Sequence, residues 1–143
     1  MLIMLTSDQV AARWPLLKRA IIESHPPIVV AKEGYFSRVL LDLYTGAKQA
    51  WAGKVDGKEI MYGITSHIKD VDDNSNILLI YALWGMTNEV PVSFYKSCLT
   101  TIYKYAKLQK YDKVVAYTIH DQIVQMAARA GANTQWHLIE WEL

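Results

Sequence analysis

The apolar residues of this chain follow two different periods, and the period changes near residue 47. Before that point they recur three and four residues apart in two stretches, 10–21 and 36–43, which is the spacing of one helical face. Directly after it they alternate with polar residues, which is typical of strands. A short apolar run at 2–5 precedes the first helical stretch. The pattern therefore predicts a strand, two helices and then a sheet.

The first helix has a recognisable start. The TSDQ sequence is a capping box, in which the Thr6 hydroxyl accepts from the backbone amide of Gln9 and the Gln9 side chain reaches back. Pro15 lacks a backbone donor, so it is expected to kink or divide this helix. The HPP sequence at 25–27 is expected to end it.

The alternating segments 49–55 and 60–68 are separated by Asp56-Gly57. Such a pair between alternating runs is typical of a two-residue hairpin, because a type I′ turn needs positive φ at both central positions. Ahead of these segments, Gly46 can adopt the left-handed conformation that ends the second helix. We expect two antiparallel strands here.

After the polar sequence DVDDNSN comes ILLIYALW at 77–84, a continuous apolar run that predicts a central strand covered on both faces. An amphipathic helical pattern then runs from about 91 to 110, and KVVAYTI at 113–119 has the composition of a buried strand. A strand, a helix and another strand require a crossover, so 77–84 and 113–119 should be parallel in one sheet. A last helix at 121–130 and a closing strand at 135–143 complete the prediction.

Together these elements predict the α/β (α+β) class, with a mixed sheet and helices on both faces, in a single domain that covers 1–143. The chain has 143 residues, of which 52% are hydrophobic and 20% charged, so it can bury an ordinary core. Its 15 basic and 14 acidic residues nearly cancel. This balance provides no electrostatic footprint for nucleic acid or for an anionic membrane.

The number of cysteines and the N-terminal sequence indicate the cellular compartment of the protein. The one cysteine, Cys98, cannot form an internal disulfide, and its apolar neighbours indicate a buried residue in a reducing compartment. The N-terminal MLIML is too short for a signal-peptide core, and no apolar run reaches the length of a membrane span. A cytoplasmic protein is expected.

Three stretches resemble a known family: the Asp56-Gly57 hairpin, the sequence YALWGMTNEVPVSFYKSCL, and the sequence VVAYTIHDQIVQMAARAGA. With the order of elements, they resemble the GNAT superfamily of N-acetyltransferases. The resemblance implies a mixed sheet of about six to seven strands. It also implies an N-acyltransferase that moves an acetyl group from acetyl-CoA to a small amine or to an amine of a protein.

In this family acetyl-CoA lies in an opening between two parallel strands, with its pyrophosphate at the start of the long helix. Unpaired amides and a partial positive charge favour an anion there. The resemblance places Trp84 and Tyr117 near the point where the two strands diverge. It assigns the cofactor to the central strand, the following loop and the helix start, namely Leu83, Trp84, Gly85, Met86, Thr87, Val92 and Ser93.

The loop departs from the family pattern, which has Arg or Gln followed by glycines. Here it contains one glycine, Gly85, and neither Arg nor Gln. Glu89 lies near the helix start, where a carboxylate repels phosphate, and Pro91 removes an amide donor. Acetyl-CoA binding is therefore expected to be weak or absent.

The catalytic tyrosine common in the last helix of the family is missing, since Ala127 and Ala128 stand in that region. His120 is the best titratable candidate, because it follows a parallel strand at the end where α/β folds place ligands. A role in capping the last helix, or a plain surface position, is the competing interpretation.

A second function stays open, a catalytically inactive GNAT-fold binding or structural module that acts on a protein partner. The chain is similar in outline to small phage-encoded proteins, whose location would be the host cytoplasm or the virion. A surface of Tyr103, Tyr105 and Lys107 on the long helix could bind that partner. DVDDNSN lacks the Gly and Glu of a calcium loop and the histidines lack zinc spacing, so no metal is expected.

Overall fold

The structure is a computed structural model, and it describes residues 1–24, 32–87 and 89–143. In these ranges the chain forms five strands and four helices. In chain order they are β1 (Leu2–Met4), α1 (Ser7–Ser24), α2 (Tyr35–Thr45), β2 (Lys48–Val55), β3 (Lys58–Lys69), β4 (Asn76–Gly85), α3 (Val92–Leu108), β5 (Lys113–Ala116) and α4 (Asp121–Arg129).

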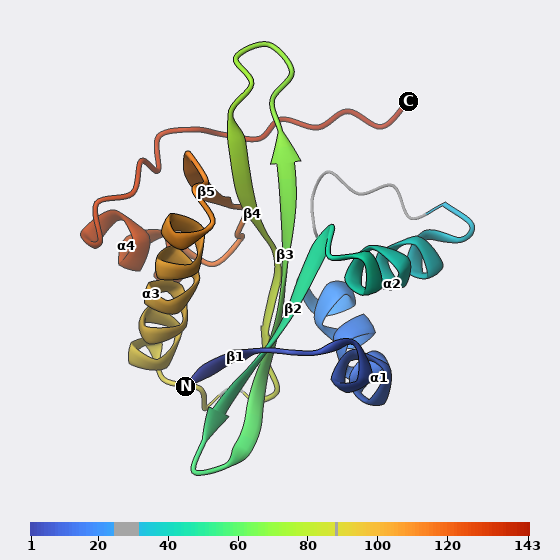
Figure 1. The fold of residues 1–143 in the computed structure, drawn as a ribbon. Coiled ribbons are helices and arrows are strands. Elements are labelled where there is room, and N and C mark those ends of the chain that lie inside the picture. Colours follow the sequence, from blue (N-terminus) through green and yellow to red (C-terminus); the bar gives the residue numbers. More distant parts are fainter. Residues whose placement is uncertain (25–31, 88) are drawn as a thin grey trace.

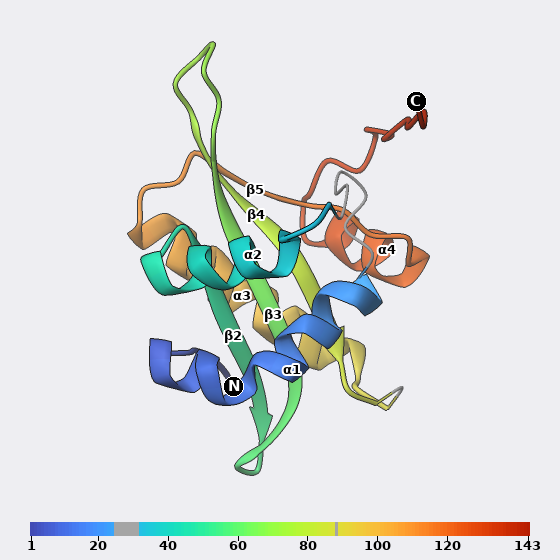
Figure 2. The ribbon, with the colours of Figure 1, turned by 90° about the vertical axis from the view of Figure 1, so that its right-hand side faces the viewer.

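The sheet lies between two layers of helices (Figure 1). Helices α1 and α2 cover one face, as Figure 2 shows from their side, and α3 and α4 lie on the other. The strand order is β1-β2-β3-β4-β5, and neighbours are antiparallel except for the parallel pair β4 and β5. The mixed sheet with helices on both faces is thus confirmed, as is the parallel pairing of the two predicted strands.

Each face of the sheet has its own hydrophobic core. Successive residues of a strand point to opposite faces, so Tyr62 packs with α1 and α2 while its neighbour Met61 packs with α3. Both side chains are almost completely buried. Cys98 of α3 is buried in the second core, as predicted from its apolar neighbours. The continuous apolar run of β4 is explained by these two cores, which cover both faces of the strand.

Local sequence signals form as predicted at three places. The Thr6 amide donates to the Gln9 side-chain oxygen at 2.9 Å, and the Gln9 amide donates to the Thr6 hydroxyl at 3.4 Å. Asp56 and Gly57 have φ of 50° and 77°, as the hairpin requires. Gly46 closes α2 with φ 85°. These features depend on residues only a few positions apart.

Of the two effects predicted for Pro15, a kink or a division of the first helix, the division is wrong, because α1 is one helix from Ser7 to Ser24. Leu17 and Ala20, which follow the proline, are both fully buried against the sheet. Their burial holds the second half of the helix in place and offsets the lost hydrogen bond. The predicted helix end at 25–27 lies outside the described residues.

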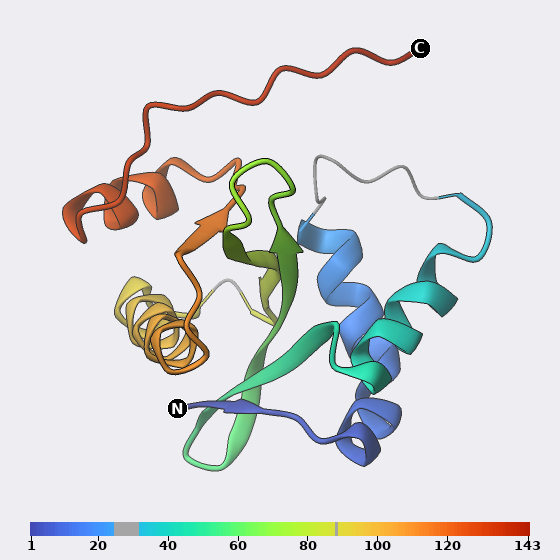
Figure 3. The ribbon, with the colours of Figure 1, turned by 45° about the horizontal axis from the view of Figure 1, so that its top comes forward.

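The predicted closing strand at 135–143 is also wrong, so the sheet has five strands in the described ranges instead of six or seven. The segment after α4 runs apart from the sheet (Figure 3), and Trp136, Ile139 and Trp141 are 85%, 69% and 77% exposed. The predicted strand at 113–119 likewise ends at Ala116. Alternating apolar and polar residues specify which side chains share a face of a strand. The strand itself forms only where the backbone of a neighbouring strand supplies hydrogen-bond partners.

Candidate functional site

The two parallel strands, β4 and β5, lie at one side of the sheet and separate part-way along their length. β5 pairs with β4 from Lys113, opposite Ile77, to Ala116, opposite Ile80, and there the pairing ends. β4 continues to Gly85 with no strand on that side in the described ranges. The carboxyl ends of parallel strands are where open α/β sheets bind ligands. The opening after Ile80 is therefore the first part of the candidate site.

A β-bulge lies at the same point. Ile64 is opposite Ala82 while Thr65 is opposite Ile80, so Tyr81 is the extra residue of β4. A bulge bends its strand and changes the direction of a side chain, and bulges are frequent next to active sites. Tyr81 therefore marks both the bend in β4 and the first position beyond the pairing with β5.

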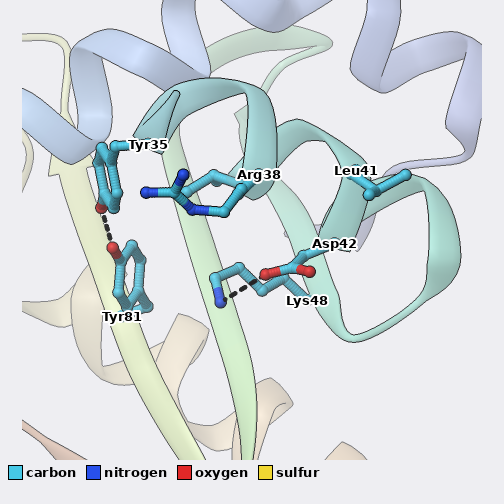
Figure 4. Close-up of a pocket in the computed structure, with 7 residues that line it drawn as sticks. Tyr35, Arg38, Leu41, Asp42, Lys48 and Tyr81 are labelled. Carbon is cyan, nitrogen blue, oxygen red and sulfur yellow. Dashed lines mark hydrogen bonds and ion pairs between the residues drawn. The ribbon is translucent and has the colours of Figure 1, made fainter. Parts of the chain in front are cut away.

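A cavity of about 330 Å³ lies beside Tyr81, between α2, β2 and β4 (Figure 4). The hydroxyls of Tyr35 and Tyr81 share a hydrogen bond at one end of it. Its volume is at the lower limit of the range that small-molecule sites have in proteins. The cavity, here called the Tyr81 pocket, is lined by Tyr35, Arg38, Val39, Leu41, Asp42, Lys48 and Tyr81.

Lys48 is fixed inside the Tyr81 pocket. Its ammonium lies 3.1 Å from the Asp42 carboxylate and 3.3 Å from the Ser66 hydroxyl, and 5.2 Å from the centroid of the Tyr81 ring. Only 15% of the Lys48 side chain is exposed. A cation held over an aromatic face in this way is stabilised by the ring quadrupole.

The other charged and phenolic groups give the Tyr81 pocket an excess of positive charge. Arg38 donates to the backbone carbonyl of Glu33 at 3.1 Å, and in the described ranges it pairs with no carboxylate. Asp42 is already paired with Lys48. Burial raises the pKa of the Tyr35 phenol, so this group stays protonated at neutral pH and can donate a hydrogen bond.

The edge of β4 beyond the bulge is occupied by side chains of this chain. The Leu83 amide donates to the Ser24 hydroxyl at 3.1 Å, and that hydroxyl donates to the Leu83 carbonyl at 3.4 Å. At Gly85 a Cβ would lie 2.5 Å from the Tyr95 hydroxyl oxygen. The Met86 amide donates to a carbonyl of β3 at 2.8 Å. The amides of Leu83 and Met86, both predicted to bind the cofactor, are thus engaged within the chain.

Tyr95 places a phenol on the α3 side of this edge. Burial raises its pKa, and contact with the Gly85 backbone acts in the opposite direction. The sequence prediction concerned only the tyrosine that the last helix of the family commonly carries, and it did not assign Tyr95 to the site. The missed signal is the position of Tyr95 in the first turn of α3, four residues after Pro91, which directs its side chain back toward β4.

The remaining predicted cofactor residues lie in two different surroundings. Val92 and Ser93 are exposed in the first turn of α3, where helix amides have no partner within the helix. Thr87 is exposed in the loop, and its hydroxyl accepts from the Glu89 amide at 3.4 Å. Trp84 packs toward the core of α1 and α2, on the opposite face from α3. It therefore does not line the same surface as Val92 and Ser93.

His120 lies directly before α4 and is exposed. Its side chain makes no capping hydrogen bond to the helix, so the capping interpretation finds no contact in the structure. Its backbone amide donates to the Thr118 hydroxyl at 3.1 Å. Tyr117 directly follows the last paired residue of β5 and is 45% exposed, which places it at the divergence as predicted.

The three residues of the long helix that were predicted to bind a protein partner do not all face solvent. Tyr103 is exposed, with the Lys107 ammonium 4.9 Å from its ring centroid. Tyr105 instead faces inward, with its ring 5.2 Å from that of the buried Trp51. Only Tyr103 and Lys107 of the three are therefore presented to solvent.

The acidic loop at 70–76 uses its carboxylates for its own turns. Asp70 accepts from the Asp72 amide at 2.8 Å, and Asp73 accepts from the Ser75 amide at 2.9 Å. Among the residues that the structure describes, no three His, Cys, Asp or Glu side chains group together as metal ligands would. In the same part of the chain no helix combines the length and apolar character needed to span a bilayer.

The residues of the Tyr81 pocket were not predicted from the sequence. Tyr81 belongs to an apolar run in which nothing indicates a bulge, and Lys48 precedes an ordinary strand pattern. Arg38 and Asp42 are four residues apart and share one face of α2, which was the one available signal.

No family model matches the chain, and no curated protein matches its sequence. Solved structures match over its whole length. One is an aminoglycoside acetyltransferase from an uncultured soil metagenomic sample, in complex with trehalose. It has a TM-score of 0.74 at 11% sequence identity, and the match covers 100% of this chain and 95% of that protein's chain. Another is a ribosomal-protein-alanine N-acetyltransferase from Brucella melitensis biovar Abortus 2308, which has a TM-score of 0.70 at 12% identity, and the match covers 100% of this chain and 99% of that protein's chain.

A third structure, described as a predicted acetyltransferase with acetyl-CoA from Clostridium acetobutylicum, has a TM-score of 0.70 at 11% identity and covers 98% of this chain and 95% of its own. These likenesses show that the chain has the fold of the GNAT N-acetyltransferases. The resemblance found in the sequence is confirmed at the level of the fold.

Proposed function

We propose that this protein is an acyl-CoA-dependent N-acyltransferase that transfers an acetyl group to an amine bound in the Tyr81 pocket. The observation that supports this function best is the position of Tyr81. It lines the pocket on the α2 side and is the first residue of β4 beyond the pairing with β5. An acceptor bound on the α2 side of the sheet and an acyl-CoA bound along the β4 edge on the α3 side can meet at this bend in β4.

Acetyl-CoA supplies the activated acyl group, and the residues predicted for it here are those of the β4 edge and the α3 start. The fit is partial. Val92 and Ser93 offer a helix start, whereas Leu83 is bonded to Ser24 and Glu89 lies exposed just ahead of the helix. Binding along the edge requires the Ser24 hydroxyl to leave Leu83, which a rotation about its side-chain bond allows.

In the proposed reaction the amine nitrogen attacks the thioester carbonyl, an amide bond forms and the carbon–sulfur bond breaks. The acceptor ammonium must lose a proton before attack, and the leaving thiolate takes one up. His120 remains the candidate base predicted from the sequence, on the β5 side of the opening. Tyr95, a protonated phenol at Gly85, is suited to return a proton to the thiolate.

The charge of the Tyr81 pocket indicates the class of acceptor. Asp42 is neutralised by Lys48, which leaves the Arg38 guanidinium to interact with a ligand. An amine that also carries a carboxylate, such as an amino acid or a peptide, would pair with Arg38. A polycationic acceptor would be repelled by the Arg38 guanidinium, whose charge is not neutralised by Asp42.

The second candidate function is an inactive GNAT-fold module that binds a protein partner. The occupation of the β4 edge by Ser24 and Tyr95 favours it, because these side chains stand where a cofactor would bind. The exposed pair of Tyr103 and Lys107 is the candidate contact for that partner.

Calorimetry with acetyl-CoA separates the two functions. Wild type, Glu89→Gln and the distant control Asp72→Asn are titrated under the same conditions. We expect weak binding by wild type and by the control, and tighter binding by Glu89→Gln because a charge that repels phosphate is removed. Binding by wild type at low micromolar strength, roughly −8 kcal/mol, would contradict the inactive module. No binding by any variant at millimolar ligand would contradict the acyltransferase.

A further inference from the structure

Lys48 carries a potential nucleophile that the proposed reaction does not use. Its amine lies in the Tyr81 pocket, where the acceptor amine is proposed to bind, and only 15% of its side chain is exposed. Figure 4 shows the Lys48 ammonium and the Asp42 carboxylate pointing toward each other, on the same side of the pocket as α2 and β2. An amine of the chain itself is therefore present in the pocket of the proposed acceptor.

Three contacts hold the Lys48 amine in place. They are the Asp42 carboxylate at 3.1 Å, the Ser66 hydroxyl at 3.3 Å and the Tyr81 ring, whose centroid lies 5.2 Å away. Ser66 belongs to the central strand β3 and is itself buried, so this partner has little freedom to move. A nucleophile that is already held near a reacting carbon attacks much faster than one that must first be ordered.

Tyr81 connects this amine to the proposed reaction centre, because it is both the bulge residue of β4 and the first residue beyond the pairing with β5. Among the lysines that the structure describes, Lys48 alone lines the Tyr81 pocket. Lys54, at the other end of β2, has similar surroundings without that position. It lies 3.9 Å from the Glu59 carboxylate, and 29% of its side chain is exposed. The two lysines differ mainly in their distance from the bend in β4.

Asp42 gives the Lys48 amine a route to lose its proton. An ammonium must become a free amine before it attacks, and the Asp42 carboxylate lies within hydrogen-bond distance to accept the proton. The nitrogen then attacks the carbonyl of a thioester, an amide bond forms and the carbon–sulfur bond breaks. Of the two protons that the nitrogen loses, one is taken up by the leaving thiolate and one passes from Asp42 to solvent.

We propose that Lys48 is a self-acylation site, to which an acyl thioester at the bend in β4 transfers its acyl group. This inference rests on the proposed meeting of thioester and acceptor at Tyr81. The charged groups of the pocket are two cations, Arg38 and Lys48, and one carboxylate, Asp42. Acylation removes the charge of Lys48, leaves Asp42 without this partner and fills part of the cavity. The modified pocket therefore repels an acceptor that carries a carboxylate, and the modification switches the pocket off for that acceptor.

Peptide mapping by mass spectrometry, after incubation of the full chain with a thioester, locates the modified lysines. Two donors are compared, acetyl-CoA and S-acetyl-N-acetylcysteamine, a small thioester without the pyrophosphate. Lys48 should be acetylated at least about tenfold faster than Lys54 and than exposed lysines such as Lys104. Exposure alone predicts the opposite order, because a reagent in bulk solution reaches exposed amines first. Preference for Lys48 with either donor supports the proposal, and preference with neither donor would overturn it.

Two variants assign the fast label to one amine. Lys48→Arg keeps a positive charge beside Asp42 and should abolish the fast phase of labelling, whereas the matched control Lys54→Arg should leave it unchanged. The result also separates this inference from the proposed function. Acetyl transfer to an amino acid without fast labelling of Lys48 would overturn the inference and leave the function. Fast labelling of Lys48 by the small thioester, in a protein that does not bind acetyl-CoA, would support the inference and contradict the acyl-CoA function.

Discussion

The hydroxyl of Ser24, at the end of α1, hydrogen-bonds both the amide and the carbonyl of Leu83 in β4, a residue 59 positions away. This contact closes the edge of β4 just beyond the point where β4 and β5 diverge. A backbone edge that could bind a ligand is therefore satisfied by the chain itself. Access of a cofactor to Leu83 depends on one side chain.

Ser24→Ala should strengthen acetyl-CoA binding, because it frees the Leu83 amide without adding bulk. Calorimetry should show a gain of about threefold to tenfold, the worth of one recovered hydrogen bond of about 1 kcal/mol. The folded state should lose a similar amount of stability. Ser37→Ala, an exposed serine of α2, is the control and should leave affinity unchanged. Weaker binding by Ser24→Ala would mean that Ser24 itself holds the cofactor.

Arg38→Gln should raise the KM of an acceptor that carries a carboxylate by about tenfold, the value of one charged hydrogen bond. The reason is that Arg38 has no carboxylate partner in the described ranges. Acceptors without an anionic group should be affected little. Steady-state kinetics on a matched pair, an amino acid and the amine that lacks its carboxylate, make the comparison. Arg19→Gln, on the surface of α1, is the control, and equal effects on both substrates would contradict the assigned role.

His120→Gln tests the base predicted from the sequence. If His120 takes the proton of the acceptor, kcat should fall by about a hundredfold or more. Binding of the acceptor should change little, since Arg38 and Lys48 of the Tyr81 pocket are left in place. Because His120 is exposed, the variant should unfold at the same temperature as wild type. Unchanged kcat would remove His120 from the mechanism and leave the phenols of the site as the next candidates.

Glu59 makes the stability of the fold depend on pH. Arg13 donates to its carboxylate at 2.7 to 2.9 Å and Tyr62 donates to the same group, joining α1 to β3. The hydrogen bond from Arg13 lowers the pKa of Glu59 most, with Tyr62 adding to it. Because the pKa is lowered in the folded state, this stabilisation is present above the unfolded-state pKa and is lost as pH falls through the folded-state pKa.

Glu59→Gln should therefore lower the free energy of unfolding by about 2 kcal/mol at pH 7, and the difference from wild type should shrink below about pH 4. Burial and the bond to Glu59 raise the pKa of Tyr62 to about 12, so a second loss of stability is expected as pH rises through that value. Urea unfolding across the pH range measures both. Glu23→Gln breaks only an exposed pair with Arg19 and should cost under about 0.5 kcal/mol.

Much of the fold was predictable because its signals are local. The Thr6 and Gln9 capping box and the Asp56-Gly57 turn require only residues within a few positions of each other. The parallel pairing of β4 and β5 followed from the order of a strand, a long helix and a strand. The departure of the loop before α3 from the family pattern was also visible in the sequence, since Gly85, Glu89 and Pro91 lie only a few positions apart.

The site was less accessible to prediction because its residues come from distant segments. Arg38 and Lys48 meet Tyr81 only after α2 and β4 pack against each other. Nothing in ILLIYALW indicates that Tyr81 is a bulge, since that depends on its alignment with β3. The predicted closing strand was wrong for the reverse reason: its alternating pattern is present in the sequence, but the segment does not lie beside the edge of a strand in the structure.

The sequence by itself determined where the helices and most strands lie, and which faces they bury. These follow from propensity, periodicity and charge over short distances. Only the tertiary structure decided that Tyr81 bends β4, that Ser24 closes the edge at Leu83, and that residues 135–143 stay unpaired. Such contacts depend on which segments meet in space, and a backbone edge has no signature in the residues that supply it.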